Sequence, residues 1–579
     1  MIKIMKNRVN GWAIIGAFVF MIVQVICDLY LPTLTSDMIN KGVAQGNVSY
    51  IWQVGYIMLG VAAVGIVAAV GNVFIASRLA QKLGHSLRSN IYKKVLHFSS
   101  YEFDQIGNSS LITRTSTDVL QIQNVTVMML RMMIQAPIML IGASILAYNK
   151  QKELTVIFLV AVPILIIVIA AVMTFAVPLF KTLQKRIDHI NLVFREGLTG
   201  VRVIRAFNQD AYEQKRFDGV NKEYTDNARK VFSITALMSP MMTLVLSATN
   251  IAIIWYGGHL IGDMSMQVGN LVAFMTYAMQ ILSSFMMLSM VFVMLPRAQA
   301  AAARINEVLD KNDSIEDKPG AVTIDRSQLG ASQLSFDQVN FRYVGAEKAA
   351  LTDINFEAKA GQTIAIIGGT GSGKSTLINL IPRLFDVESG DIKIDGKSIY
   401  GLTQASLHDQ ISLVQQKTVL FKGTIRSNLQ FGNENATDDE MWHALDIAQA
   451  KSFVEESADG LDGTVEQDGD NFSGGQKQRL AIARSLVKKA SVYLFDDSFS
   501  ALDFKTDAKL RGSLKTDENV KDSVVLVVAQ RISSVTGADL ILVIDGGKIV
   551  GKGTHEELKA TNKTYQEIMQ SQIREGDAE

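Results

Sequence analysis

The chain has 579 residues, of which 48% are hydrophobic, with a mean hydropathy of +0.20 and a formal net charge of +0. This combination of length and hydropathy excludes a single soluble domain. The neutral charge gives no support for a nucleic-acid partner. Cys27 is the one cysteine, which excludes an internal disulfide framework and a cysteine-ligated zinc site.

Long apolar stretches are concentrated in the first half of the chain. A membrane-spanning helix needs about 20 mostly apolar residues. Six stretches meet this length: 11–34, 54–77, 124–148, 154–180, 232–262 and 268–295. The first follows Lys3, Lys6 and Arg8, but its apolar run is too long for a signal peptide and no small-residue cleavage site follows, so we expect it to be retained. The sequence therefore predicts a polytopic α-helical membrane domain with six spans.

Basic residues predict the orientation of these spans, because Lys and Arg are enriched in cytoplasmic connections. They gather in the connections after the second and fourth stretches, at 78–114 and 185–230. This places the N-terminus, both connections and everything after residue 297 in the cytoplasm. Apolar residues recur at spacings of three and four in 78–98 and 181–207, which is typical of amphipathic helix. We expect the membrane helices to continue past the bilayer there.

A second domain follows the polar segment 310–320. From about residue 334 the pattern changes to short β-branched strands, turns and amphipathic helices, which indicates an α/β domain. We therefore divide the chain into a membrane domain with cytoplasmic helical extensions (1–310), a linker (311–333) and an α/β domain (334–579).

A phosphate-binding loop opens this α/β domain. The segment GGTGSGKS lies between a predicted strand and a predicted helix and matches the P-loop pattern G-x-x-x-x-G-K-[ST]. Its glycines allow backbone N–H groups to surround phosphates at a helix N-terminus. Lys374 supplies a charge to the β- and γ-phosphates, and Ser375 offers a hydroxyl to Mg²⁺. The candidate nucleotide ligands here are Gly368, Gly369, Thr370, Gly371, Ser372, Gly373, Lys374, Ser375 and Thr376.

Two further motifs lie beyond the P-loop. The strand VYLFD ends in Asp496, which is placed to hold Mg²⁺ directly or through water. The segment NFSGGQKQR (471–479) contains a small, donor-rich turn made by Ser473, Gly474, Gly475 and Gln476. With SALD (500–503) and the strand 524–530, residues 334–570 resemble the nucleotide-binding domain of an ABC transporter. The membrane half, with EGLTGVRVIRAFNQD (196–210), is similar to that of ABC exporters.

The resemblance implies further roles. Tyr343 matches the aromatic residue that stacks on adenine, although ordinary strand packing is the alternative. Gln416 matches the glutamine that contacts Mg²⁺ and the attacking water; otherwise it is a surface glutamine. In the family, the signature turn closes over the ATP of another nucleotide domain, so this chain is expected to dimerise. Segments 97–104 and 206–213 are expected to be coupling helices, the second reaching the partner's domain.

The chain departs from the family pattern at two catalytic positions. Asp497 stands where the family has the Glu that polarises water, and Gln530 stands where it has a His that contacts the γ-phosphate. Misplacing a catalytic group by about 1 Å costs on the order of 100-fold in rate, or about 2.7 kcal/mol. Glutamine cannot carry the positive charge of histidine. Together the two changes predict a site that binds ATP and hydrolyses it slowly.

The signature turn is nearly intact, with Phe472 replacing the usual Leu. An impaired ATP site beside an intact signature turn indicates a non-identical partner that carries Glu and His at the two departed positions. The resemblance is therefore to the degenerate-site subunit of heterodimeric bacterial multidrug exporters. A homodimer with two slow sites, exporting a lipid or a peptide, is the alternative.

The membrane half contains most of the chain's 24 methionines. Methionine surfaces adapt to varied apolar ligands, so Met286 and Met290 are candidate substrate contacts for small hydrophobic or cationic compounds. Helix packing or lipid contact explains the same residues equally well. Asp28 and Arg131 lie within apolar stretches, where an ionised group normally faces a cavity or a partner. Asp28 is a candidate for selecting cations, and Arg131 for pairing with it or lying near an interface.

Three function classes are compatible with parts of these patterns. An ATP-driven exporter in the bilayer of a bacterial plasma membrane accounts for all of them. A soluble ATPase of nucleic-acid repair also uses a similar signature turn, but the spans and the absence of a basic patch exclude it. A ligand-gated channel on the same scaffold is not excluded by sequence.

Overall fold

The computed structural model describes residues 10–324 and 333–576. Lys3, Lys6 and Arg8, and residues 325–332 of the predicted linker, lie outside the described residues. The chain divides into two compact units. The first contains the residues up to Leu96 and Ser109–Lys311; the second contains His97–Asn108 and the residues from Asn312 onward. The predicted division at 1–310, 311–333 and 334–579 stays a prediction.

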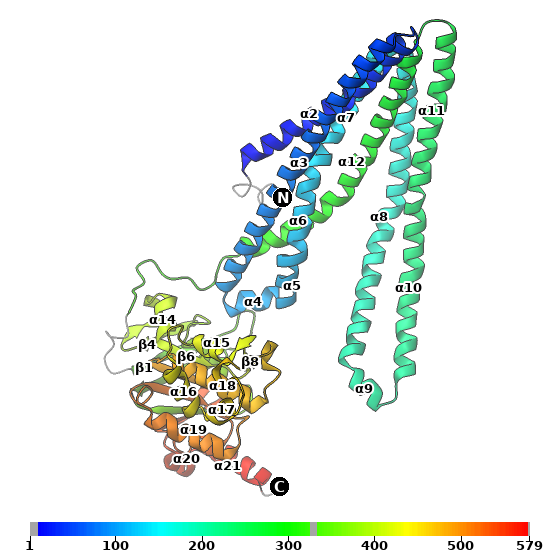
Figure 1. Cartoon of the computed structure of the whole chain (residues 1–579). Helices are drawn as coiled ribbons and strands as arrows, with labels where there is room; N and C mark the ends of the chain where they lie inside the picture. The colour runs from blue at the N-terminus through cyan, green and yellow to red at the C-terminus, as the bar shows by residue number, and fades with distance from the viewer. Residues whose placement is uncertain (1–9, 325–332, 577–579) are drawn as a thin grey trace. The chain divides into compact units, whose positions relative to one another are not determined.

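The first unit is helical (Figure 1). Among its described residues, six helical segments are long and apolar enough to cross a membrane, which confirms the predicted membrane domain. Short π-helical segments at Arg114–Asp118 and Met129–Met133 join neighbouring α-helices into one span, and another at Met38–Val43 extends α2 to the end of the first span. The α-helices are α2 (Gly11–Asp37), α3 (Val48–Leu96), α5 (Asn108–Thr113), α6 (Val119–Met128), α7 (Ile134–Lys150), α8 (Val156–Thr199), α9 (Val201–Ala206), α10 (Asp210–Ala236), α11 (Met238–Gly262) and α12 (Val268–Leu309).

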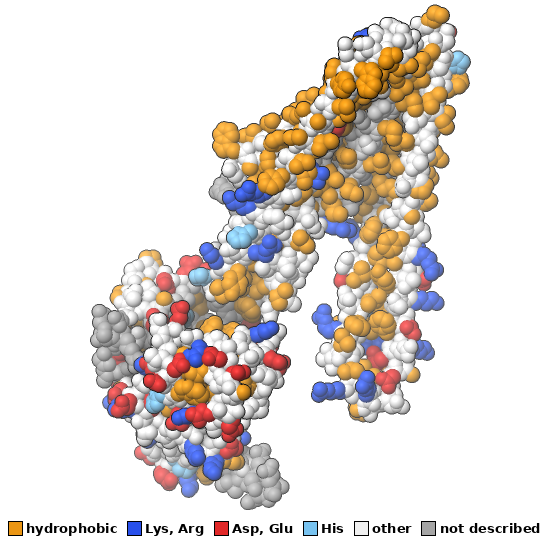
Figure 2. All heavy atoms as spheres, viewed as in Figure 1, with side chains coloured by type: hydrophobic (Ala, Val, Ile, Leu, Met, Phe, Trp, Pro, Cys, Tyr) orange, Lys and Arg blue, Asp and Glu red, His pale blue; other side chains and the backbone are white. Residues whose placement is uncertain are grey.

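Apolar side chains cover the outside of these helices as well as their contacts. Figure 2 shows hydrophobic side chains over the upper helices of the unit. Leu159, Ile167 and Ile251 are 73%, 65% and 67% exposed. Aliphatic exposure on this scale marks a surface that water does not cover. The inner contacts include the stacked rings of Phe158 and Phe274, whose centroids are 5.0 Å apart.

Two of the helices continue from the apolar stretches far into the segments predicted to leave the bilayer. α3 continues to Leu96, and α8 continues to Thr199. α8, the short α9 and α10 form an arm in which α10 packs against α8 through Leu183, Ala228 and Val231 (Figure 1). The short helix at the tip is α9, so the predicted coupling segment 206–213 covers its last residue, the following turn and the start of α10.

The second unit combines α4 (Ser100–Ile106) with the α/β domain. α4 begins with a capping box formed by Ser99 and Glu102, and the Ser99 hydroxyl also lies 2.9 Å from that of Ser314 in the linker. The predicted helix near 97–104 is therefore present. Its placement beside the linker was not predicted, because only tertiary contact brings residues 99 and 314 together.

Three sheets form the α/β domain. An antiparallel sheet has the order β2-β1-β4-β5, a mostly parallel sheet has the order β12-β11-β3-β10-β9-β6, and β7 pairs with β8. The strands are β1 (Gln333–Phe341), β2 (Leu351–Lys359), β3 (Thr363–Ile367), β4 (Ser389–Ile394), β5 (Lys397–Ser398), β6 (Ile411–Val414), β7 (Gly423–Thr424), β8 (Thr464–Val465), β9 (Val492–Asp496), β10 (Val524–Val528), β11 (Leu540–Asp545) and β12 (Lys548–Gly553).

Helices cover both faces of the larger sheet, as expected for parallel strands buried on both sides. They are α13 (Lys374–Leu380), α14 (Gln404–Gln410), α15 (Ile425–Gln430), α16 (Asp438–Ile447), α17 (Lys451–Glu455), α18 (Gly474–Val487), α19 (Phe504–Thr516), α20 (His555–Thr561) and α21 (Lys563–Gly576). The predicted fold class, a six-span helical membrane domain followed by an α/β P-loop domain, is confirmed.

Strand register brings the predicted site residues to one edge of the sheet. β10 lies between β3 and β9, with Val528 paired to Ile366 on one side and to Asp496 on the other. Because these strands and β6 run parallel, their carboxyl ends meet at the same edge. The P-loop follows β3, Asp497 follows β9, Gln530 follows β10 and Gln416 follows β6.

Candidate nucleotide-binding site

The P-loop has the backbone expected of a phosphate cradle. Gly371 and Gly373 have φ of +79° and +106°, which side chains other than glycine rarely adopt. A Cβ at Gly368 would lie 2.1 Å from the carbonyl oxygen of Ile544, so only glycine fits there. The Ser372 hydroxyl oxygen is buried, and it has no hydrogen-bond partner among the described residues. Such a group is a ready donor to a phosphate oxygen.

Lys374 lies inside this loop. Its ammonium donates hydrogen bonds to the carbonyl oxygens of Gly368 at 2.9 Å and Gly369 at 2.7 Å. Burial lowers the pKa of Lys374, while the nearby carboxylates of Asp497 and Asp496 act in the opposite direction. The charge that the motif needs is therefore already directed into the cradle.

Ser375 and Asp496 form the pair predicted to hold Mg²⁺. The Ser375 hydroxyl donates to Asp496 Oδ1 at 2.9 Å. Burial raises the pKa of Asp496, and Ser375 and Lys374 partly oppose this shift. A hydroxyl and a carboxylate in contact beside a phosphate cradle supply the oxygen ligands that Mg²⁺ prefers, so the residues fit the metal.

The predicted catalytic residues meet at Asp497. Its Oδ2 accepts hydrogen bonds from Gln530 Nε2 at 2.7 Å and from Gln416 Nε2 at 3.3 Å. Asp497 is only 6% exposed and has a left-handed backbone with φ +52°. Burial raises the pKa of this carboxyl, an effect that the hydrogen bonds from Gln416, Ser500 and Gln530 and the charge of Lys374 partly offset. Two neutral amide donors thus hold the acid.

Gln572 of α21 is a site residue that the motifs did not predict. Its side-chain amide donates to the carbonyl oxygen of Gln530 at 2.6 Å, and its Oε1 accepts from the backbone N–H of Ile532 at 2.8 Å. One side chain therefore holds the backbone on both sides of residue 531. The sequence offers no signal for this role, because Gln572 is 42 residues from Gln530 and lies in an ordinary amphipathic helix.

Tyr343 lies just beyond β1. Its ring contacts Phe341 and Phe385 at centroid distances of 4.8 and 5.4 Å, both edge-on. Its hydroxyl lies 3.0 Å from that of Thr376 in α13. The side chain is 39% exposed, so the ring is held from two sides and keeps an open surface beside the P-loop helix. Such a ring can stack on a nucleobase.

The signature turn is separate from these residues. Ser473 and Gln476 form a capping box at the start of α18, with Ser473 N donating to Gln476 Oε1 at 2.9 Å. Ser473 and Gly474 are exposed. Within the described residues, no hydrogen bond links Ser473–Gln476 to the P-loop. Phe472 packs on the domain core with its ring 6.3 Å from that of Phe453, which accounts for an aromatic residue at this position.

The candidate substrate residues of the first unit are less closely arranged. Asp28 is half-buried in α2, and its carbonyl oxygen accepts a hydrogen bond from Gln280 of α12 at 3.0 Å. Met286 and Met290 of α12 are 44% and 53% exposed. Among the described side chains, no ion pair joins Arg131 to Asp28. The structure does not gather these residues into one site.

A P-loop domain with an FSGGQ turn, fused after six apolar helices, defines the class of membrane-bound ABC ATPases. Family models agree: residues 14–285 match the ABC transporter transmembrane region, and residues 351–500 match the ABC transporter domain. The chain belongs to the ABC transporter family, with the fold of an exporter half-transporter. It is a multi-pass membrane protein, and the nucleotide that its α/β domain binds is ATP.

Relatives cover nearly the whole chain. An uncharacterized ABC transporter ATP-binding protein of Mycobacterium tuberculosis H37Rv is 40% identical over 577 residues, covering 99% of this chain and 98% of the relative. A multidrug resistance ABC transporter ATP-binding and permease protein of Lactococcus lactis subsp. cremoris is 30% identical, with 96% and 92% covered. A bacterial Atm1-family ABC exporter with ATP bound has the same fold, with a TM-score of 0.80, 24% identity, and 98% and 99% covered.

Proposed function

We propose that this chain is one subunit of a heterodimeric exporter of hydrophobic or cationic compounds, and that its own ATP site binds nucleotide but hydrolyses it slowly. The observation that carries the proposal is the arrangement at Asp497. Its short carboxylate is held by the amides of Gln530 and Gln416. These amides orient the acid but cannot supply a titratable or positively charged group beside it.

Binding and turnover depend on different residues in this site. The P-loop glycines, Lys374 and Tyr343 are positioned for nucleotide binding. Ser375, Asp496 and Gln416 would hold Mg²⁺, which neutralises phosphate charge when bound. The residue that must order the attacking water is Asp497, whose side chain is one methylene shorter than that of Glu. We therefore expect ATP to bind tightly at this site and to persist there.

A partner is supported by two surfaces that this chain leaves open. The signature turn is exposed and makes no bond to the P-loop among the described residues. The tip of the α8–α10 arm carries Phe207, which is 72% exposed, and Val203, which is 60% exposed. Apolar side chains at the end of a polar arm favour a protein contact. The expected partner is a half-transporter with Glu and His where this chain has Asp497 and Gln530.

The proposal includes an orientation and a substrate class. From the basic connections we expect the N-terminus and the nucleotide domain to lie in the cytoplasm of a bacterial cell. The multidrug resistance relative from Lactococcus lactis favours drug-like substrates. Asp28, Met286 and Met290 remain candidate contacts. ATP-driven closure of the nucleotide domains would shift the spans between inward- and outward-facing states.

Nucleotide trapping tests the proposal. The chain is co-purified with its partner, incubated briefly with photoreactive azido-ATP, washed and irradiated. We expect most of the retained label on this chain and uncleaved nucleotide in its site. Equal labelling of both subunits with diphosphate only would contradict a slow site in this chain. A stable homodimer with normal turnover would favour the alternative of a symmetric exporter.

A further inference from the structure

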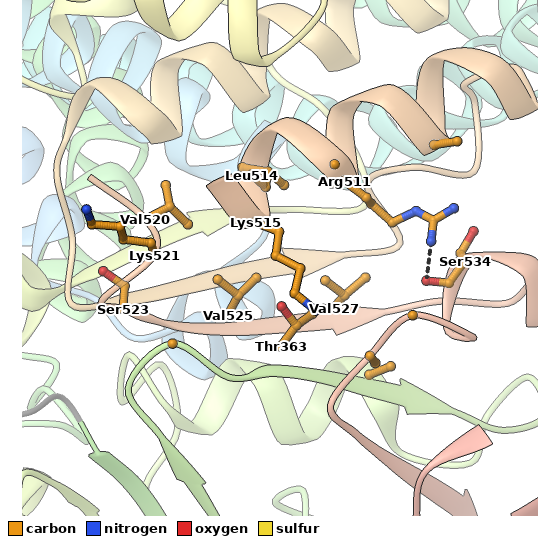
Figure 3. Close-up of a pocket in the computed structure, with 16 residues that line it drawn as sticks. Thr363, Arg511, Leu514, Lys515, Val520, Lys521, Ser523, Val525, Val527 and Ser534 are labelled. Atoms are coloured by element: carbon orange, nitrogen blue, oxygen red, sulfur yellow. Dashed lines mark hydrogen bonds between the residues drawn. The ribbon is translucent and has the colours of Figure 1, made fainter. Parts of the chain in front are cut away.

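A cavity of about 330 Å³ lies in the α/β domain between α19 and one face of the larger sheet (Figure 3). Thr363 and Val525, at the amino ends of β3 and β10, line it, whereas the P-loop follows the carboxyl end of β3. The cavity is therefore separate from the nucleotide site. Its apolar floor is made by residues that are each at most 7% exposed: Ala365, Leu514, Val520, Val525 and Val527.

Positive side chains surround this floor. Arg511, Lys515 and Lys521 line the cavity, and no carboxylate does so among the described residues. Arg511 is neutralised by Asp507, with Nε 2.9 Å from Oδ1. Lys515 reaches over the strands toward Thr363 in Figure 3, and its ammonium forms an ion pair with Asp539 at 3.7 Å. Lys521 makes no ion pair with any described residue. The cavity therefore keeps positive charge that is only partly balanced.

Two exposed glycines lie along the cavity, and neither position has a steric requirement for glycine. Gly512 lies inside α19 and Gly537 lies in the turn opposite, and a Cβ at either position would meet nothing within 4 Å. Glycine weakens a helix interior relative to alanine. Packing thus gives no reason for glycine at position 512, which lines the cavity.

We propose that this cavity binds a small organic anion, with a flat apolar body on the floor and a carboxylate, sulfonate or phosphate group near Lys515 and Lys521. An apolar floor beside positive charge that is only partly balanced is complementary to such a ligand and unfavourable for a cation. The far wall includes Ser534, whose carbonyl oxygen accepts from Arg511 at 3.4 Å. Ser534 follows Gln530 by four residues, so the ligand would lie beside the segment that carries Gln530.

The probe is 2-naphthalenesulfonate, added to the full-length chain in detergent and followed by ligand-observed NMR. We expect saturable binding that Lys515→Ala and Lys521→Ala each weaken by about two- to fivefold, the worth of an exposed ion pair. Lys509→Ala is the matched control, because Lys509 lies on the same helix and does not line the cavity. It should leave binding unchanged.

A variant that fills the cavity and an uncharged probe complete the test. Gly512→Leu should abolish binding while retaining ATP binding and the melting temperature, because the added side chain enters open space. The neutral 2-naphthalenemethanol should bind more weakly than the sulfonate. Absence of saturable binding, or binding that these variants leave unchanged, would overturn the proposal. Binding of the probe does not depend on ATP hydrolysis. A negative result here would therefore leave the proposal of a slow ATP site in this chain untouched.

Discussion

The side-chain amide of Gln530 donates a hydrogen bond to Asp497 Oδ2 at 2.7 Å, joining the two catalytic positions at which the sequence differs from the family resemblance. The two substitutions therefore form one local arrangement. Gln530 is long enough to donate to the short carboxylate of Asp497, and Gln416 donates a second hydrogen bond to it at 3.3 Å. Asp497 and Gln530 are expected to act as a unit when either is changed.

Lengthening the acid should restore turnover. In the assembled transporter whose partner site has been inactivated, Asp497→Glu should raise the ATP hydrolysis rate, and Asp497→Glu with Gln530→His should raise it by up to about 100-fold, because the carboxylate regains its reach. Phosphate release measures the rate. Asp522→Glu, an exposed acid in the turn before β10, serves as the matched control. Unchanged turnover in the double variant would show that the short carboxylate does not limit hydrolysis.

Removing the Tyr343 ring should weaken nucleotide binding. Tyr343→Ala should lose affinity for a fluorescent ATP analogue by about 5- to 150-fold, since base–aromatic stacking contributes about 1–3 kcal/mol. Tyr343→Phe keeps the ring and loses only the contact with Thr376. It should bind almost normally. If both variants bound equally weakly, the hydroxyl contact and not stacking would be the important feature.

The buried acid should make stability depend on pH. Burial raises the pKa of Asp497 above its unfolded value of about 3.9. The folded state then holds the proton more tightly, so the free energy of unfolding falls as pH rises through the folded pKa. Asp497→Asn removes this titration and should melt at a higher temperature than the wild type at pH 7. The difference should close as pH falls toward about 4. A lower melting temperature for the variant at neutral pH would contradict this account.

Gln572 of α21 should affect the rate of ATP hydrolysis more than the affinity for ATP. Gln572→Ala removes both bonds to the backbone around Gln530, which should change the hydrolysis rate of the assembled transporter with little effect on ATP affinity. Gln566→Ala on the same helix is the matched control, because its amide contacts Lys559 instead. A loss of ATP affinity in Gln572→Ala equal to the loss of rate would indicate general loosening of the domain.

Residues that carry their own local signal were predictable from sequence. The glycines around Lys374 define the P-loop, and Asp496 ends an apolar strand, so both indicate their place without tertiary information. Six apolar stretches likewise predicted six spans. Gln572 and Ser314 gave no such signal, because their roles arise from contacts with segments far away in the chain. The coupling role of 206–213 stays a prediction, since the contact with a partner's nucleotide domain lies outside this chain.

The geometry at Asp497 refines the sequence prediction. Sequence alone indicated that Asp is too short and that Gln lacks charge. It did not indicate that Gln530 and Gln416 converge on the same oxygen of that carboxylate, because this depends on β6, β9 and β10 being adjacent. The cavity under α19 was also not predictable, since it forms only where helix and sheet meet.

In the proposed heterodimer, a non-identical partner supplies most of the ATP hydrolysis. The direct measurement is steady-state ATP turnover of the assembled transporter carrying either Asp497→Asn in this chain or the equivalent Glu→Gln change in the partner. We expect turnover to be nearly unchanged by the first substitution and almost abolished by the second. Equal losses from the two substitutions, or brisk turnover by this chain alone, would contradict the account.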